Sequence, residues 1–104
     1  MTEPLLLAID LGTSSVKVLA ATRAGVIVAR GVAEYAILQP APGFAEQNPA
    51  DWWAAICSST RQLLASAAVP ATEIAAVGFS GMMMGCLPVD ASGAPLRSCM
   101  IWAD

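Results

Sequence analysis

The chain has 104 residues, of which 57% are hydrophobic and only 12% are charged, and its net charge is −3. This composition excludes a disordered chain, and the five scattered basic residues argue against a nucleic-acid-binding surface. Charged residues interrupt every long apolar run, so we expect neither a membrane-spanning helix nor a signal peptide. A free-standing small domain usually carries about a quarter charged residues. We therefore expect a piece of a larger protein, with further segments covering part of its apolar surface.

The cysteines indicate a reducing environment. Cys57, Cys86 and Cys99 are odd in number, their spacing fits no zinc pattern, and the sequence contains no histidine. Free thiols in the cytoplasm are the simplest interpretation.

Three strands joined by short connections open the chain. Residues 5–11 are nearly all apolar, which is typical of a strand buried on both faces. A second strand is expected over 16–22 and a third over 26–35, with a turn at Gly25 between them. The short connections predict an antiparallel meander.

The turn between the first two strands has the composition of an anion-binding site. The stretch IDLGTSSVK, residues 9–17, places one carboxylate, Asp10, at the end of the first strand, followed by Gly12 and three hydroxyl residues. Gly12 permits close backbone approach, and free N–H groups in such a turn can face an anion. Lys17 adds a positive charge, or is simply an exposed strand lysine. Asp10 would repel a phosphate unless a metal ion or water intervenes, or it caps the turn by accepting backbone N–H bonds.

A helix is expected after a loop at 39–47. Asn48 is a suitable N-cap, Pro49 suits the first helical position, and Pro70 lies beyond an end near Ala68. We expect Trp52 and Trp53 to pack in the core rather than to bind a ligand. The apolar face is predicted to comprise Trp53, Ile56, Thr60, Leu64 and Ala67, flanked by Trp52 and Leu63.

A fourth strand over 74–79 is reached through this helix and is therefore predicted to run parallel to its neighbour. The loop SGMMMG, residues 80–85, follows its C-terminal end. An extended segment at 86–89, a turn at 90–93 and a strand at 96–102 complete the chain. Because Asp104 follows this strand without a cap or closing helix, we expect a truncated domain.

This order of elements resembles the start of the ribonuclease-H-like, or actin-like ATPase, fold: an α/β domain with a mixed sheet of three antiparallel strands, a crossover helix and a parallel fourth strand. Three segments resemble, in order and spacing, blocks of the FGGY carbohydrate kinases, with the xylulokinases as the closest subgroup. They are IDLGTSSVK at 9–17, FAEQNPADWW at 44–53 and AVGFSGMMMGCLPVDASGAPLRSCMIWAD at 76–104. The resemblance implies that residues 1–104 are the N-terminal part of the first kinase domain.

The resemblance assigns roles to the first turn. Asp10 matches the aspartate that supports Mg²⁺, through water, and phosphate positioning. The residues that match the ATP-phosphate turn and its neighbouring cation are Gly12, Thr13, Ser14, Ser15 and Lys17.

The same resemblance places the sugar at the third block. Met83 and Met84 align with a Met-His pair that contacts the sugar in xylulokinases; here Met84 replaces the histidine and Met82 replaces the preceding glutamine. The methionines could instead fill a gap in the core. Trp102 could stack on the sugar and Asp104 could accept from its hydroxyls, or both could be structural.

The implied activity is transfer of the γ-phosphate of ATP, with Mg²⁺, to a hydroxyl of a sugar such as D-xylulose. Gluconate, erythritol, ribulose and glycerol stay open as substrates, and homodimerisation of a full-length protein stays open. The family's catalytic base and adenosine site lie beyond residue 104, so we expect these residues alone to be inactive. A chaperone-type actin-like ATPase, or a non-catalytic partner-binding fragment, are the alternatives from other classes.

Both loops should open at one edge of the sheet, because the first and fourth strands are expected side by side and parallel. The sequence therefore predicts that phosphate and sugar groups meet there.

Overall fold

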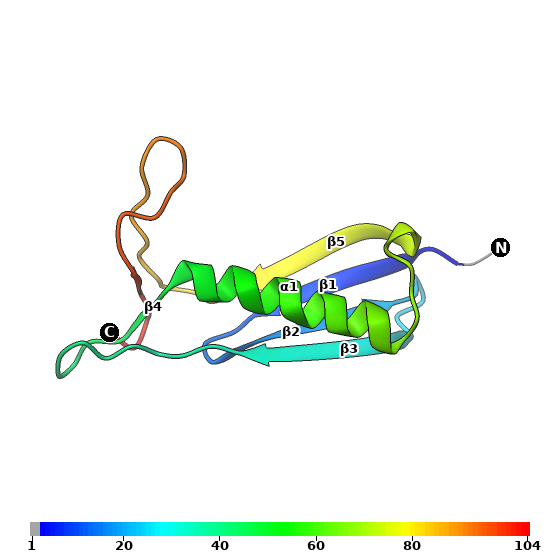
Figure 1. The fold of residues 1–104 in the computed structure, drawn as a ribbon, viewed down its shortest axis with the longest axis horizontal. Coiled ribbons are helices and arrows are strands. Elements are labelled where there is room, and N and C mark those ends of the chain that lie inside the picture. The colour runs from blue at the N-terminus through cyan, green and yellow to red at the C-terminus, as the bar shows by residue number, and fades with distance from the viewer. Residues whose placement is uncertain (1–2) are drawn as a thin grey trace.

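The computed structural model describes residues 3–104 as one mixed sheet with a long helix across one face, and a smaller two-stranded sheet at one end (Figure 1). The elements are β1 (Leu5–Leu11), β2 (Ser15–Ala21), β3 (Ile27–Glu34), β4 (Glu46–Gln47), α1 (Pro49–Ser66), a 3-10 turn (Ala71–Glu73), β5 (Ile74–Gly81) and β6 (Cys99–Met100).

The main sheet has the strand order β3-β2-β1-β5. Strands β1, β2 and β3 form the expected antiparallel meander, and β5 returns through α1 to lie parallel to β1. This confirms the predicted mixed sheet and the parallel crossover. Among residues 3–104, no helix combines the length and apolarity that crossing a bilayer requires.

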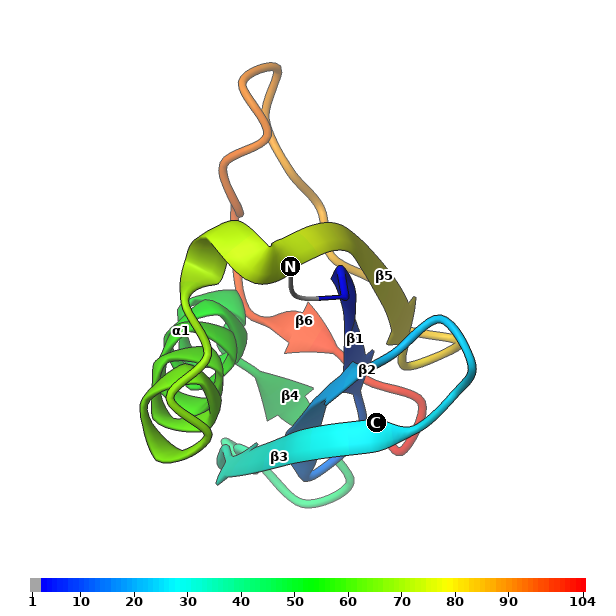
Figure 2. The same cartoon turned by 90° about the vertical axis from the view of Figure 1, so that its right-hand side faces the viewer.

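Only one face of the sheet is covered. Leu7, Val16 and Val18 are buried beneath α1, which lies on one side of the sheet when viewed along the strands (Figure 2). Alternate residues such as Leu6 and Val32 lie exposed on the other face. The expectation that residues 5–11 are buried on both faces is therefore wrong for the described chain, because no described element covers the second face.

Helix α1 begins and ends with well-formed caps. The side chain of Asn48 accepts from the amide of Ala50 at 3.0 Å, which confirms the predicted N-cap. At the other end Ala68 adopts a positive φ of 51°, and the amide of Val69 donates to the carbonyl of Leu64. This is a Schellman ending in which alanine occupies the position that glycine favours.

The buried stripe of α1 differs from the predicted one. Its fully buried residues are Ala55, Ser59 and Leu63, whereas Trp53 is 67% exposed and Trp52 is half-buried. The small residues allow a close approach to β3, where a Cβ on Gly31 would lie 2.6 Å from the carbonyl oxygen of Ser59. Hydrophobic periodicity favours large residues and overlooked this Ala-Ser seam, so placing Trp53 in the core was wrong.

The small sheet corrects two further expectations. Part of the expected loop at 39–47 is strand β4, which pairs with β6 in the register Glu46↔Met100 and Gln47↔Cys99. The strand expected over 96–102 is reduced to β6, and residues 101–104 leave it in a turn. Ala45, Cys99 and Ile101 form a second small core beneath this pair. Two residues give little local signal, so β4 exists only because β6 reaches it.

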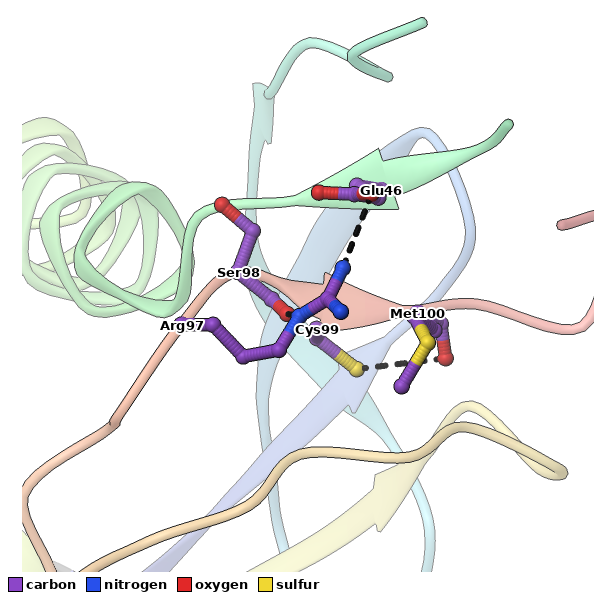
Figure 3. Close-up of polar contacts among 5 residues, drawn as sticks. All are labelled: Glu46, Arg97, Ser98, Cys99 and Met100. Atoms are coloured by element: carbon purple, nitrogen blue, oxygen red, sulfur yellow. Dashed lines mark hydrogen bonds and ion pairs between the residues drawn. The ribbon is translucent and has the colours of Figure 1, made fainter. Parts of the chain in front are cut away.

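A hairpin between β5 and β6 projects from the body (Figure 1). Arg97 at its base donates to the carboxylate of Glu46 at 2.9 Å and so ties the hairpin to β4 (Figure 3). The chain measures 54 × 28 × 22 Å, and its radius of gyration of 15.8 Å exceeds the roughly 13 Å of a compact domain of this size.

Candidate functional site

A cleft of about 390 Å³ opens where β1 and β5 end. The parallel register sets Asp10 beside Ser80 and Leu11 beside Gly81, so the turn after β1 and the loop after β5 leave the sheet together. The cleft is lined by Asp10, Leu11, Gly12, Thr13, Gly81, Met82, Met83, Met84 and Trp102. The expected meeting of the two loops at one sheet edge is confirmed.

Asp10 is exposed near the C-terminal end of β1. The backbone amides that donate to an Asn or Asp side chain within residues 3–104 reach Asn48 and Asp90 rather than Asp10, so the structure does not support the interpretation of Asp10 as a cap for the turn. Lys17 is directly opposite Asp10 in the antiparallel register, which places both side chains on the same face of the sheet. Lys17 does not line the cleft but lies in a second hollow beside Val32 and Arg30.

The turn after Asp10 is held by contacts with its carbonyl groups. The amide of Gly12 donates to the carbonyl of Ser15 at 2.9 Å, and the amide of Tyr35 donates to the carbonyl of Ser14 at 3.1 Å. The Tyr35 hydroxyl contacts the carbonyl oxygens of Gly12 and Ser15. Burial raises the pKa of this hydroxyl above its ordinary 10.0, and the charge of Asp10 adds to the rise. Ser14 and Ser15 belong to this turn but do not line the cleft.

A second side chain reaches the turn from β4. The amide nitrogen of Gln47 donates to the carbonyl of Thr13 at 2.5 Å, and its oxygen accepts from the indole of Trp52 at 3.0 Å. Gln47 is only 1% exposed. Sequence reasoning missed Tyr35 and Gln47 as site residues. The available signal was the position of Gln47 inside the family-like segment at 44–53.

The methionines that were expected to face a sugar divide into two groups. Met83 and Met84 are exposed in the cleft, so they do not fill a gap in the core, whereas Met82 packs against the small core around Cys99. Met84 also holds a positive φ of 60°, a conformation that costs a non-glycine residue about 1 kcal/mol or more. Such strain at a cleft is typical of a functional position.

Trp102 connects the two sides of the cleft. Its indole nitrogen donates to the hydroxyl oxygen of Thr13 at 3.0 Å. Asp104 lies outside the cleft, in an adjoining hollow that shares Met84 and Trp102. The structure therefore brings together Asp10, Gly12, Thr13, Met83, Met84 and Trp102, and leaves Ser14, Ser15, Lys17 and Asp104 at the border.

The metal-ligating side chains at the cleft suit an ion that keeps most of its water ligands better than an ion held entirely by protein ligands. Among residues 3–104, His, Cys, Asp and Glu side chains form no group of three that could hold a metal. A single exposed carboxylate beside a hydroxyl fits Mg²⁺, which keeps several waters and is held by one or two carboxylates together with phosphates.

Residues 5–104 match the sequence profile of the N-terminal domain of the FGGY family of carbohydrate kinases. The chain belongs to the FGGY family. It is 33% identical over 104 residues to a xylulose kinase of Staphylococcus epidermidis, covering 100% of this chain and 21% of that protein. A glycerol kinase of Methylibium petroleiphilum is 36% identical over 100 residues, covering 95% and 20%.

A solved structure of a xyloylose (xylulose) kinase from Brucella ovis superimposes with a TM-score of 0.91 at 36% identity, over 96% of this chain and 21% of that one. The chain thus spans about a fifth of the length of the FGGY relatives it matches. The resemblance carried by the three sequence blocks is confirmed, and the sheet observed here is that of FGGY sugar kinases.

Proposed function

We propose that these residues form the phosphate-turn and sugar-loop half of an ATP-dependent carbohydrate kinase, which transfers the γ-phosphate to a hydroxyl of a sugar such as D-xylulose. One observation supports this most strongly: parallel pairing of β1 with β5 sets the turn at 12–15 and the loop at 80–85 around one cleft. Phosphoryl transfer depends mainly on positioning and charge stabilisation, and such a cleft can hold both reactants.

The phosphate side of this proposal rests on the turn. Gly12 lets the turn backbone come close to the nucleotide phosphates, and Thr13 offers them its amide and hydroxyl, with Ser14, Ser15 and Lys17 at the border. Asp10 holds Mg²⁺ through water, and the ion, when bound, neutralises charge on the transferred phosphate. Asp10 is not the base that takes the hydroxyl proton; that group lies outside residues 1–104.

The sugar side rests on the loop and on Trp102. The indole face of Trp102 can cover the apolar side of a sugar ring, while Asp104 accepts from hydroxyls at the neighbouring hollow. Met83 and Met84 shape the cleft but supply only weak acceptors. For this reason gluconate, erythritol, ribulose and glycerol accompany xylulose as candidate substrates.

The apolar face opposite α1 supports the proposal that residues 1–104 are the first part of a larger kinase domain. Leu6, Val28 and Val32 are exposed there. We place the kinase in the cytoplasm because Cys57, Cys86 and Cys99 are free thiols. Homodimerisation of the full-length kinase is a separate question, which its elution volume in size-exclusion chromatography would answer.

The test is a substrate screen of the full-length enzyme. ATP consumption is measured with pentuloses, hexonates and polyols, and one class is expected to stimulate turnover strongly. Absence of stimulation by every sugar and polyol would refute the kinase assignment. A polypeptide of residues 1–104 serves as the control and should show no sugar-dependent turnover, because it lacks the base.

A further inference from the structure

Two carbonyl groups of the phosphate turn are held from behind by side chains of other elements. The hydroxyl of Tyr35, which follows β3, donates to the carbonyl of Gly12. The amide of Gln47, in β4, donates to the carbonyl of Thr13 at 2.5 Å. These contacts bridge 23 and 34 residues of sequence, so they are tertiary features of the fold.

Each contact determines where the next amide points. In a trans peptide the C=O of one residue and the N–H of the next point in opposite directions, and the described chain has no cis peptide. Holding the Gly12 carbonyl therefore directs the amide of Thr13 away from Tyr35. Holding the Thr13 carbonyl likewise directs the amide of Ser14 away from Gln47.

Both amides are free to serve a ligand. Within residues 3–104, the amides of Thr13 and Ser14 donate no backbone hydrogen bond, whereas the amide of Gly12 is used inside the turn. Two successive outward N–H groups form a concave anion-binding surface. Thr13 also lines the cleft, and its hydroxyl, having accepted from Trp102, is left able to donate.

The orientation of Gln47 is itself determined by a neighbour. Its oxygen accepts from the indole of Trp52 at 3.0 Å, so its NH₂ group must face Thr13. The side chain is 1% exposed, which leaves water little access to replace either bond. Trp52 lies in the first turn of α1, so the helix start fixes the amide that holds the turn.

We propose that Gln47 and Tyr35 are positioning residues, which aim the amides of Thr13 and Ser14 at the phosphates of the nucleotide, with Trp52 setting the orientation of Gln47. This role deepens the proposed kinase function and depends on it. Neither residue touches the reacting atoms; each acts through a carbonyl of the turn.

The experiment uses the full-length kinase with MgADP as the probe. Gln47→Met keeps the side-chain length without adding charge, and Tyr35→Phe removes only the hydroxyl. Loss of one hydrogen bond to a charged phosphate corresponds to on the order of a tenfold change in affinity. We expect calorimetric MgADP binding to weaken roughly tenfold in Gln47→Met, with a parallel rise in KM for ATP and an unchanged KM for the sugar.

Ser59→Ala is the matched control. It removes another buried hydrogen bond, from the Ser59 hydroxyl to the carbonyl of Ala55 at 2.6 Å, in the seam between α1 and β3. This control should lower the melting temperature while leaving both KM values unchanged. If Gln47→Met fails to fold, Tyr35→Phe decides, with the same expected split between the two KM values.

The outcomes separate the two proposals. Folded Gln47→Met and Tyr35→Phe proteins with wild-type affinity for MgADP would overturn the positioning role and leave the kinase function intact. Equal rises in the KM for ATP and for sugar would overturn it as well, because they indicate general loosening. A wild-type protein that binds no MgADP would overturn the kinase proposal itself.

Discussion

Replacing Gly31 by alanine should destabilise the protein, because this glycine lies where α1 approaches the sheet most closely. A Cβ at this position would lie 2.6 Å from the carbonyl oxygen of Ser59 and 3.5 Å from the Cβ of Leu63. The nearest obstacle is helix backbone, which cannot rotate away like a flexible side chain. The helix must therefore move outward by several tenths of an ångström.

The size of the effect follows from two opposing contributions. Overpacking a well-packed seam costs roughly 1–3 kcal/mol. Replacing a strand glycine by alanine also lowers the conformational entropy of the unfolded chain. This stabilises the folded protein by about 0.5–1 kcal/mol and offsets part of the overpacking cost. The central values of these two ranges leave a net loss of about 1 kcal/mol. This corresponds to a fall in melting temperature of roughly 4–8 °C for a domain of this size.

Urea unfolding followed by tryptophan fluorescence measures this loss. Gly78→Ala is the matched control: it lies in β5 of the same sheet, and a Cβ there would meet no heavy atom within 4 Å. The control should be more stable than the parent protein by about 0.5–1 kcal/mol, because it keeps the entropy gain without the steric clash. Equal stabilities for the two variants would show that the close contact between Gly31 and Ser59 does not govern helix packing.

Three further predictions concern caps, titration and the ion pair. Ala68→Gly should raise the free energy of unfolding by about 1 kcal/mol, because Ala68 holds a φ of 51° at the helix end; unchanged or lower stability in urea would contradict the cap assignment. The folded state raises the pKa of Tyr35 above 10.0, so the unfolded chain ionises first and the free energy of unfolding should fall as the pH rises above that value. Tyr35→Phe should lose this dependence, and a tyrosinate absorbance titration that runs identically in folded and unfolded protein would argue against it. Glu46→Gln breaks a half-exposed ion pair with Arg97 and should cost less than about 1 kcal/mol, an effect that should shrink in high salt; a salt-independent loss would indicate a packing effect instead.

Much of the fold could be predicted from local sequence signals. Strand β1 was predicted with its observed bounds, and the start of α1 followed from Asn48 and Pro49. Both depend on residues within one turn or strand of each other, where capping geometry and side-chain periodicity operate. The parallel placement of β5 followed from the helical crossover alone.

Contacts over long sequence separations were not predictable in the same way. Trp53 appeared to be a core residue because it is large and apolar, yet the close approach of Gly31 to Ser59 selects small residues for the seam. Strand β4 carries no local signal in two residues and depends on pairing with β6, about 50 positions later.

The sequence by itself determined the family and the two halves of the cleft. The residue types of the turn at 12–15 and the loop at 80–85 follow their strands directly, so their chemistry was readable in order along the chain. Only the tertiary structure decided which of these residues line the cleft, leaving Lys17 and Asp104 outside it. It also decided that Gln47 and Tyr35 hold the turn, because a side chain reaches a carbonyl 34 or 23 residues away only once the strands and α1 have packed.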